Sequence, residues 1–511
     1  MNQLIISPVI LPLLIGILLL FLREQDTFAK RVISILSLIT QLSLALLIIQ
    51  AVSHGNILSY ALGNWPAPFG IVLVADRLAA WMLIITALLS IFAFIYSTLG
   101  TDRVGRHFHV LFQLQLFGLN GAFLTSDLFN LFVFFEILLL ASYGLLLHGG
   151  GRLRTKAGLH FVVVNLAGST LFLFAVGTLY GILGTLNMAD LALRAASVAP
   201  ENIALVRAAG LLLFSVFALK AALLPLYLWL PTAYANTSAP VAALFAIMTK
   251  VGAYSILRVY TLIYGEKAGP AANLLEYWLL PLALSTIIVG SIGLVGSKHL
   301  RTQTAYLVVV SVGTLLTAFG LSSTLGISAG LYYLPHTTFA TGALFLLVDA
   351  VLIRRGDFSD RLDPGPVIAS HHLFGGLFFI TAMLMAGLPP FSGFLGKFML
   401  IKASLNHPAL PWVMTIVLIG GLLSMIALAR SGSLIFYRAN AAYVDETITK
   451  IKVLPHTHRP NTRELLPIFG LLSLCLAMTI WAEPIIRFTN ATALQLLSPE
   501  QYVHAVLGKR S

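Results

Sequence analysis

Residues 213–231 read LFSVFALKAALLPLYLWLP. The run is almost entirely apolar and long enough to form most of a membrane-spanning helix, which takes about 20 residues. Two of its residues conflict with such a helix. Lys220 carries a charge that is costly in hydrocarbon, and Pro225 lacks the N–H that a helix interior needs. The stretch therefore predicts a membrane helix that breaks next to a buried amine.

The composition of the whole chain places this stretch in a polytopic membrane protein. Of the 511 residues, 58% are hydrophobic and 10% are charged, and the mean hydropathy is +0.93. Soluble domains carry about 25% charged residues, so the chain lies far outside their range. The single cysteine, Cys475, excludes an intramolecular disulfide and a cysteine metal cluster, and we expect it to be a core thiol.

Apolar runs recur along the chain and predict about fourteen membrane-spanning segments. No connecting segment is long enough for a soluble domain, so transport or catalysis is expected within the membrane. The first run has no basic leader and no small-residue cleavage site, which indicates a retained helix. The longest polar stretch, 437–464, is expected to form an interfacial helix and a loop. The predicted spans are 3–22, 32–52, 71–97, 107–125, 128–148, 159–183, 205–230, 239–264, 274–297, 303–323, 327–353, 372–401, 411–436 and 466–488.

Positive charges are distributed unevenly among the connecting loops. Lysines and arginines gather in the loops after odd-numbered spans, and those after even-numbered spans hold only Arg194, Arg207, Lys267 and Lys402. Because positive loops stay in the cytoplasm, both termini are predicted on the outer, periplasmic side of a bacterial inner membrane, with an even number of spans. The formal charge of +12 then reflects loops near anionic membrane lipids and requires no nucleic acid.

A few ionisable residues lie inside the predicted spans. They are Glu136, Lys220, Lys250, His336 and, closer to an interface, Lys397. An ionised group at mid-bilayer costs about 2.5–3.5 kcal/mol, so pairing, neutralisation or water must offset it. Structural alternatives are a fixed ion pair between Glu136 and Lys220 and a neutral core histidine at His336. Lys397 could also reach the membrane surface. Together, the five residues favour a charge pathway.

Lysine suits such a pathway for a physical reason. Desolvation disfavours an ammonium ion and a nearby carboxylate favours it. A lysine whose carboxylate neighbour moves can therefore load and release a proton. Here Glu136 is the expected modulator and Lys220 the expected carrier.

Helix breakers accompany two of these lysines. Pro225 follows Lys220. Pro389 and Pro390 precede Lys397 in the stretch GLPPFSGFLGK. Broken helices deep in a membrane are tolerated where the freed carbonyls face protein or water. A water-filled pocket is therefore predicted at the breaks.

The two interrupted spans, the seventh and the twelfth, are five spans apart. This spacing predicts a duplicated unit of five helices, and an odd number of spans inverts the second copy. The expected fold is all-α, a polytopic membrane protein with two inverted five-helix repeats that contain broken helices. The expected divisions are 1–106 for helices 1–3, 107–264 for the first repeat, 265–438 for the second, and 439–511 for an interfacial segment and helix 14.

Four stretches around these residues carry a family resemblance. They are FEILLLASYGLL (135–146), LKAALLPLYLWLPTAYANTSAPVAALFAIMTKVGAYSILRVYTLI (219–263), LYYLPHTTFATGALFLLVDAVLIRRG (331–356) and AGLPPFSGFLGKF (386–398). Nearly the whole chain resembles the antiporter-like subunits shared by complex I, membrane-bound hydrogenases and the Mrp-type multisubunit cation/proton antiporters. Its length and span number are most similar to those of the Mrp D subunits. Tyr227 and Ser311 stand where complex I members usually have histidines, which weakens a complex I assignment.

The resemblance implies roles for the buried residues. Glu136 would be the carboxylate paired with the broken-helix lysine, Lys220. Lys250 and His336 would continue a polar axis along mid-membrane, and Lys397 would lie near an exit. The resemblance also implies cation/proton antiport driven by proton influx, with Na+, or K+ or Li+, extruded by a hetero-oligomer that includes other subunits. It implies no redox centre or other cofactor and no bound metal on this chain.

Two other functions stay open at this point. The chain could be a proton-pumping subunit of complex I or of a membrane-bound hydrogenase, or a scaffold that does not transport. Sodium prefers oxygen ligands, and mid-membrane carboxylates are scarce here. The chain is therefore expected to be chiefly the proton-handling half of its complex.

Other polar groups are expected to be structural. Histidine clusters at 107–109, 371–372 and 456–459 lie at span ends or in loops without acidic or cysteine partners, which favours interfacial positions over metal sites. Asp76 and Arg77 are expected to form an interface ion pair. Asp349 is expected to pair with Arg354 or Arg355, about a helical turn away.

Overall fold

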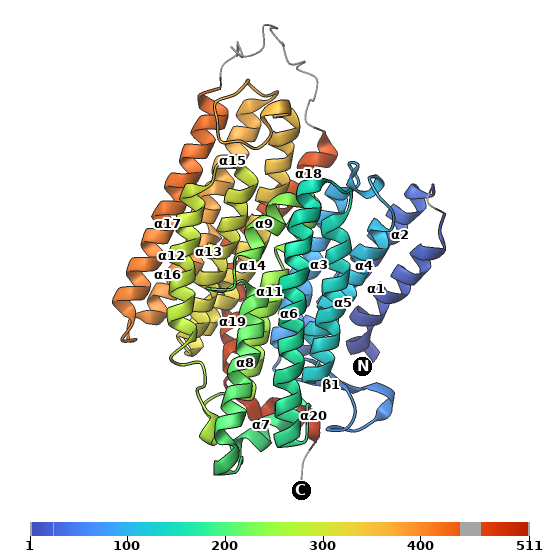
Figure 1. Ribbon diagram of the computed structural model, residues 1–511, viewed down its shortest axis with the longest axis vertical. Coiled ribbons are helices and arrows are strands. Elements are labelled where there is room, and N and C mark those ends of the chain that lie inside the picture. Colours follow the sequence, from blue (N-terminus) through green and yellow to red (C-terminus); the bar gives the residue numbers. More distant parts are fainter. Residues whose placement is uncertain (1–2, 24, 440–460, 509–511) are drawn as a thin grey trace.

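The computed structural model describes residues 3–23, 25–439 and 461–508. Helices dominate it, and most of them run along the long axis of the molecule (Figure 1). Twelve helices of the described part are long and apolar enough to cross a membrane, and two shorter apolar helices accompany them. The prediction of an all-α polytopic membrane protein is confirmed. The count of about fourteen spans and the inverted repeats stay predictions.

The N-terminal part begins at one edge of the bundle, where α1 and α2 lie on the right in Figure 1. It contains α1 (Gln3–Phe21), α2 (Thr27–Val52), the strands β1 (Leu58–Ala61) and β2 (Val72–Ala75), and α3 (Arg77–Ser97). The strands pair antiparallel, so the predicted start of the third span at residue 71 is wrong. The helix begins only after β2, because the Asp76 side chain caps it by accepting a hydrogen bond from the N–H of Ala79 at 2.9 Å.

The middle of the chain supplies the helices around the first break. They are α4 (Phe108–Leu124), α5 (Leu128–Leu147), α6 (Arg152–Leu183), α7 (Met188–Ala196), α8 (Ile203–Ala221), α9 (Trp229–Asn236), α10 (Ala239–Phe245) and α11 (Met248–Leu262). The short helix α7 lies at the lower end of the molecule in Figure 1. The region predicted as the seventh span, 205–230, is interrupted between α8 and α9.

The helices around the second break follow. They are α12 (Leu279–Gly296), α13 (Leu300–Gly320), α14 (Thr324–Arg355), α15 (His371–Ala386), α16 (Ser392–Ser404) and α17 (Leu410–Gly432), which continues into a π-helical turn at Ser433–Tyr437. In Figure 1, α16 and α17 lie at the edge opposite α1 and α2. The region predicted as the twelfth span, 372–401, is interrupted between α15 and α16.

Three helices end the chain. They are α18 (Thr462–Ile480), α19 (Ala482–Leu496) and α20 (Pro499–Leu507). The predicted last span, 466–488, is divided at Trp481, because Pro484 cannot donate a hydrogen bond to the carbonyl of Ile480. Most of the segment 437–464, expected to form an interfacial helix and loop, lies outside the described residues.

The long helix α14 occupies the centre of the bundle. It packs against α13, α16, α18 and α19, and nearly all of its side chains are buried. Pro335 lies inside this helix without interrupting it. A proline cannot donate to the carbonyl four residues earlier, and here the carbonyl of Leu331 accepts a hydrogen bond from Trp81 Nε1 of α3 at 3.0 Å instead. A neighbouring helix thus satisfies the backbone group that the proline frees.

A buried ion pair joins α3 to α11. The guanidinium of Arg258 donates to both carboxylate oxygens of Asp76, at 2.6 and 2.7 Å, and lies over the rings of Tyr254 and Tyr502. The predicted pair between Asp76 and Arg77 is wrong, since Arg77 donates to two backbone carbonyls. Adjacent residues at the start of a helix do not face each other.

The expected partners of Asp349 are also wrong. Asp349 accepts a hydrogen bond from Arg301 of α13 at 2.9 Å. Arg354 pairs with Glu464 of α18, at 2.7 and 2.8 Å, and Arg355 donates to backbone carbonyls. Five or six residues along a helix with 3.6 residues per turn lead to a different face, so each arginine meets a different neighbour.

Removing one partner of the buried Asp76–Arg258 pair should destabilise the bundle strongly. We expect Arg258→Met to lower the free energy of unfolding by about 3–5 kcal/mol, because it leaves a carboxylate buried without a counter-ion. Thermal unfolding of the purified protein measures the change. The control is Glu483→Gln, which breaks an exposed pair with Arg487 and should cost about 0–1 kcal/mol. Equal losses in the two variants would contradict the assignment.

Candidate functional site

The first break is built directly after Lys220. Helix α8 ends one residue later, and Ala222 adopts the left-handed conformation, with φ 61°, that commonly ends a helix. The non-helical segment that follows contains Pro225, and α9 begins after it. Trp229 Nε1 donates to the carbonyl of Leu219 at 3.0 Å. A protein side chain therefore bonds to a carbonyl in the last turn of α8.

The amine of Lys220 faces α6 and not a carboxylate. The side chain is buried, and its Nζ donates to Oδ1 of Asn165 at 3.1 Å. Glu136 of α5 accepts a hydrogen bond from Ser169, one turn further along α6. In the described structure, Glu136 and Lys220 thus contact the same helix without forming an ion pair with each other.

Lys250 lies on α11, which packs directly against the end of α8. Gly252 permits this contact, because a Cβ at its position would lie 2.4 Å from the backbone nitrogen of Ala221. The Lys250 side chain is fully buried, and its Nζ has no hydrogen-bond partner among the described residues. A buried ammonium ion without a partner costs more than a paired one. No structural bond therefore accounts for a lysine at this position.

The second break brings Lys397 and His336 together. Lys397 Nζ donates to the carbonyl of Ala386, the last residue of α15, at 2.7 Å. His336 of α14 shares a hydrogen bond between its Nδ1 and the hydroxyl of Ser392, the first residue of α16, at 2.9 Å. Lys397 therefore contacts the end of α15, and His336 contacts the start of α16. The Lys397 amine is bonded inside the protein and does not reach the membrane surface.

The proline residues singled out in the sequence lie in the two non-helical segments. Pro225 is between α8 and α9, and Pro389 and Pro390 are between α15 and α16. Gly387 opens the second segment with φ 80°, and a Cβ at its position would lie 2.8 Å from Cδ of Lys397. Glycine is therefore required there both for the backbone conformation and for the space that the lysine occupies.

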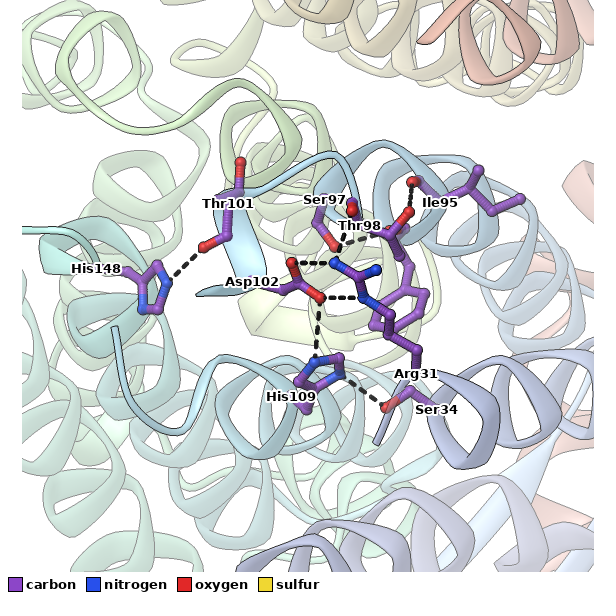
Figure 2. A network of polar contacts seen from close by, with 10 residues as sticks. Arg31, Ser34, Ile95, Ser97, Thr98, Thr101, Asp102, His109 and His148 are labelled. Carbon is purple, nitrogen blue, oxygen red and sulfur yellow. Dashed lines mark hydrogen bonds and ion pairs between the residues drawn. The ribbon is translucent and has the colours of Figure 1, made fainter. Parts of the chain in front are cut away.

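A separate polar network lies where α2, α3 and α4 meet (Figure 2). Asp102 is between Arg31, which donates to its two oxygens at 2.6 and 2.8 Å, and His109, whose Nε2 is 3.5 Å away. Burial acts to raise the pKa of Asp102, but the hydrogen bonds from His109 and Arg31 outweigh it and lower the pKa to about 2. The expectation that the cluster 107–109 lacks an acidic partner is wrong, because the α3–α4 connection folds Asp102 against α4.

The remaining histidines form no metal centre in the part of the chain that the structure describes. No group of three or more His, Cys, Asp or Glu side chains there could hold a metal ion. The rings of His371 and His372 lie against each other, with centroids 3.9 Å apart. The cluster 456–459 lies outside the described residues. Cys475 is a buried free thiol in α18, in agreement with its apolar surroundings in the sequence.

Sequence reasoning missed the neutral partners of the site residues. Asn165, Ser169 and Ser392 are short polar side chains of a kind that recurs in most of the predicted spans. The spacing of Asn165 and Ser169, four residues apart, is the one signal that could have placed them on the same face of a helix. Arg258 was missed for another reason: it lies near the end of its span, where a charge can reach the interface.

Comparison with known proteins assigns the chain to a family. A family model described as "NADH:quinone oxidoreductase/Mrp antiporter, TM" matches residues 125–425. This range contains both breaks and the buried ionisable residues Glu136, Lys220, Lys250, His336 and Lys397. The chain belongs to the NADH:quinone oxidoreductase/Mrp antiporter family of membrane proteins.

Full-length relatives narrow the assignment. The D subunit of a probable K+/H+ antiporter from Rhizobium meliloti (strain 1021) is 41% identical, covering 99% of this chain and 98% of the relative. The D subunit of a Na+/H+ antiporter from Bacillus subtilis (strain 168) is 35% identical, covering 99% and 100%. A chain in the Mrp complex from Dietzia sp. DQ12-45-1b matches with a TM-score of 0.89 at 28% identity, covering 99% and 100%. Within the family, the chain is a D subunit of the Mrp type, a transporter component and not an enzyme, which confirms the resemblance seen in its motifs.

The missing partner of Lys250 has a consequence for stability. Replacing Lys250 by methionine removes no hydrogen bond and no ion pair. We expect the free energy of unfolding to stay unchanged or to rise by up to about 2 kcal/mol. The control is Lys397→Met, which loses the bond to Ala386 and should cost about 1 kcal/mol. Thermal unfolding of the purified protein decides, and a clear loss of stability in Lys250→Met would reveal a structural partner.

Proposed function

We propose that the chain is the proton-carrying subunit of a multisubunit monovalent cation/proton antiporter. It moves protons through its buried lysines while the complex extrudes Na+ or K+. One observation carries this proposal. Lys220, Lys250 and Lys397 are buried, and in the described residues none of their amines is paired with a carboxylate. Two of the amines bond to neutral oxygens and the third has no partner.

Amines in this state suit proton exchange for an energetic reason. An ammonium ion at mid-bilayer costs about 2.5–3.5 kcal/mol, whereas the neutral amine carries no charge. If a carboxylate were bound to the amine, loss of the proton would leave that carboxylate unpaired. A neutral oxygen accepts a hydrogen bond from either form of the amine. The proton can therefore leave these lysines without stranding a second charge.

The other two ionisable residues act beside the lysines. Glu136 and Lys220 both bond to side chains of α6. The negative charge of Glu136 therefore influences whether the amine holds a proton, although the two groups are not bonded to each other. His336 contacts the first residue of α16, and Lys397 contacts the last residue of α15, so both lie at the second break. Lys250 lies on α11 beside the end of α8 and follows Lys220 in the row of buried protonatable residues. The row thus offers a protonatable group near each interruption and one between them.

The two breaks are the proposed points of proton entry and exit. Interrupted helices line hydrated cavities in other transporters with internal repeats. If residues 107–264 and 265–438 are inverted copies, the break at Pro225 opens to one face of the membrane and the break at Pro389 and Pro390 to the other. Each half would then contribute one half-channel, and the row of lysines would connect them.

The relatives support the cation and the partners of this proposal. They are named as K+/H+ and Na+/H+ antiporter subunits, and the matching structure is that of an Mrp complex. We therefore propose an alkali cation as the exchanged ion and other subunits of the complex as partners. The cation site is placed elsewhere in the complex or at a subunit boundary. Glu136, which is already bonded to Ser169 near a lysine, is a poor ligand for a cation.

The loop charges support an orientation with both termini on the outer side of the membrane. Helix α1 begins in the lower half of Figure 1, and α20 lies at its lower end. The upper end of the molecule carries the more basic loops, which we place in the cytoplasm beside anionic lipids.

Replacing Lys220 by methionine should abolish exchange without disturbing assembly. Cation-dependent dissipation of a pH gradient, measured in vesicles that contain the complete complex, is expected to fall about a hundredfold, because a proton-transferring group is lost. The matched control is Lys267→Met, since Lys267 is an exposed lysine paired with Glu500 at the end of the bundle. It should keep full activity.

Two results would contradict this prediction. Full exchange by an assembled Lys220→Met complex would make the chain a scaffold. Proton translocation that needs no alkali cation but follows a redox reaction would favour the proton-pumping alternative.

The proposed orientation predicts which loops an impermeant reagent can reach. The chain has a single cysteine, and it is buried, so a Cys475→Ser background accepts single new cysteines. Glu201→Cys, at an exposed position beyond α7, should react with an impermeant maleimide in intact cells. Arg152→Cys, exposed at the start of α6, should react only after the cells are opened. The reverse pattern would invert the orientation.

A further inference from the structure

The first break contains a polar connection that the lysine pathway by itself does not require. We propose that Asn165 and Ser169 of α6 are positioning residues, which couple Glu136 to Lys220 while holding the two charges apart. The pH range over which Lys220 exchanges its proton is then set by α6. This inference rests on the proposed function of Lys220.

The amide of Asn165 is oriented before it meets the lysine. Its Nδ2 donates to the carbonyl of Phe161, one turn earlier in α6, at 2.9 Å. Its Oδ1 then accepts the hydrogen bond from Lys220 Nζ at 3.1 Å. Rotating the amide by 180° would turn its NH2 group toward the amine of Lys220 and its oxygen toward the carbonyl of Phe161. Both bonds would then be lost. The lysine therefore meets an acceptor that is fixed in place and uncharged.

Ser169 provides the matching contact to the carboxylate. Its hydroxyl bonds to Oε1 of Glu136 and lies 3.1 Å from the carbonyl of Asn165. A serine hydroxyl has one proton to donate, so it donates either to the carboxylate or to its own helix. Protonation of Glu136 would weaken the first choice and favour the second. The charge state of Glu136 is thus communicated to the part of α6 that holds Lys220.

The packing around Lys220 makes this spacing important. Glu136 on α5 is the negative group near the lysine, and α11, which packs against α8, carries Lys250. Helix α6 contributes neutral side chains to both groups, since Ser169 bonds to Glu136 and Asn165 bonds to Lys220. In a low-dielectric interior the attraction of a charge pair rises steeply as the pair closes. A carboxylate in direct contact would therefore keep the proton on Lys220, and the neutral spacer prevents this.

The first test changes the spacer at Asn165. Cation-dependent dissipation of a pH gradient is measured across pH in vesicles that contain the complete complex. Asn165→Asp places a carboxylate on the amine with little change in volume. We expect exchange at neutral pH to fall about tenfold or more, and the pH of half-maximal exchange to rise by about one unit or more.

The second test separates the hydroxyl of Ser169 from its volume. Ser169→Ala should displace the pH profile in the same direction as Glu136→Gln, and the double variant should go no further than Glu136→Gln alone. Ser169→Thr keeps the hydroxyl and should keep the profile. The matched control is Thr170→Ala, which removes a hydroxyl from the exposed face of α6, where it bonds to the carbonyl of Leu166. Its profile should not move.

The outcomes distinguish this inference from the proposed function. Retained exchange in Lys220→Met would overturn the proposed function itself. Loss of exchange in Lys220→Met, with unmoved profiles in Asn165→Asp and Ser169→Ala, would overturn only the role of α6. If the Asn165→Asp complex does not assemble, the comparison of Ser169→Ala with Ser169→Thr decides. Equal profiles in those two variants reject the proposal.

Discussion

Hydrocarbon offers no hydrogen-bond partners, so a backbone group freed inside this bundle needs a partner from another part of the chain. The backbone shows this constraint most clearly where a helix is interrupted or contains a proline. The carbonyl opposite Pro335 is taken by Trp81 of α3. The carbonyl at the end of α15 is taken by Lys397, eleven residues further along. Each irregularity of the backbone thus requires a particular side chain from a neighbouring segment, and the site is assembled from these pairings.

The same constraint distinguishes the paired arginines from the lysines of the site. Arg258 is bonded to Asp76, Arg301 to Asp349 and Arg354 to Glu464. An arginine cannot give up its proton under ordinary conditions, so its charge must be compensated permanently. The buried lysines of the site have neutral acceptors or none. At these three positions a permanently charged arginine links two segments through a carboxylate, whereas the site lysines bond to no carboxylate in the described residues.

In the proposed mechanism, function depends on residues of α6 that carry no charge. Asn165 and Ser169 are uncharged, yet they determine which atoms Lys220 and Glu136 contact. Under the proposed function, a carboxylate at position 165 would convert a proton-exchanging lysine into a structural ion pair of the kind seen at Arg258. The identity of the spacer is therefore as important as the identity of the two charged groups.

Composition and apolar runs were sufficient to identify a membrane protein, to place most helices within a few residues and to single out the charges inside them. The misses have two physical origins. The hairpin of β1 and β2 and the division at Trp481 depend on a cap and on a proline close to a predicted span end. The ion pairs of Asp76 and Asp349 were assigned to sequence neighbours, whereas their partners come from other helices.

The sequence by itself determined that the protein lies in a lipid bilayer, that it is helical and that lysines lie beside proline breaks. Hydrophobicity and proline chemistry are properties of a short segment, so they can be recognised locally. Only the tertiary structure decided what each buried amine contacts. Asn165 and Lys220 are 55 residues apart, and a hydrogen bond between them exists only because α6 and α8 pack side by side. A contact of this kind depends on which faces of two helices meet, and no single segment of the chain contains that information.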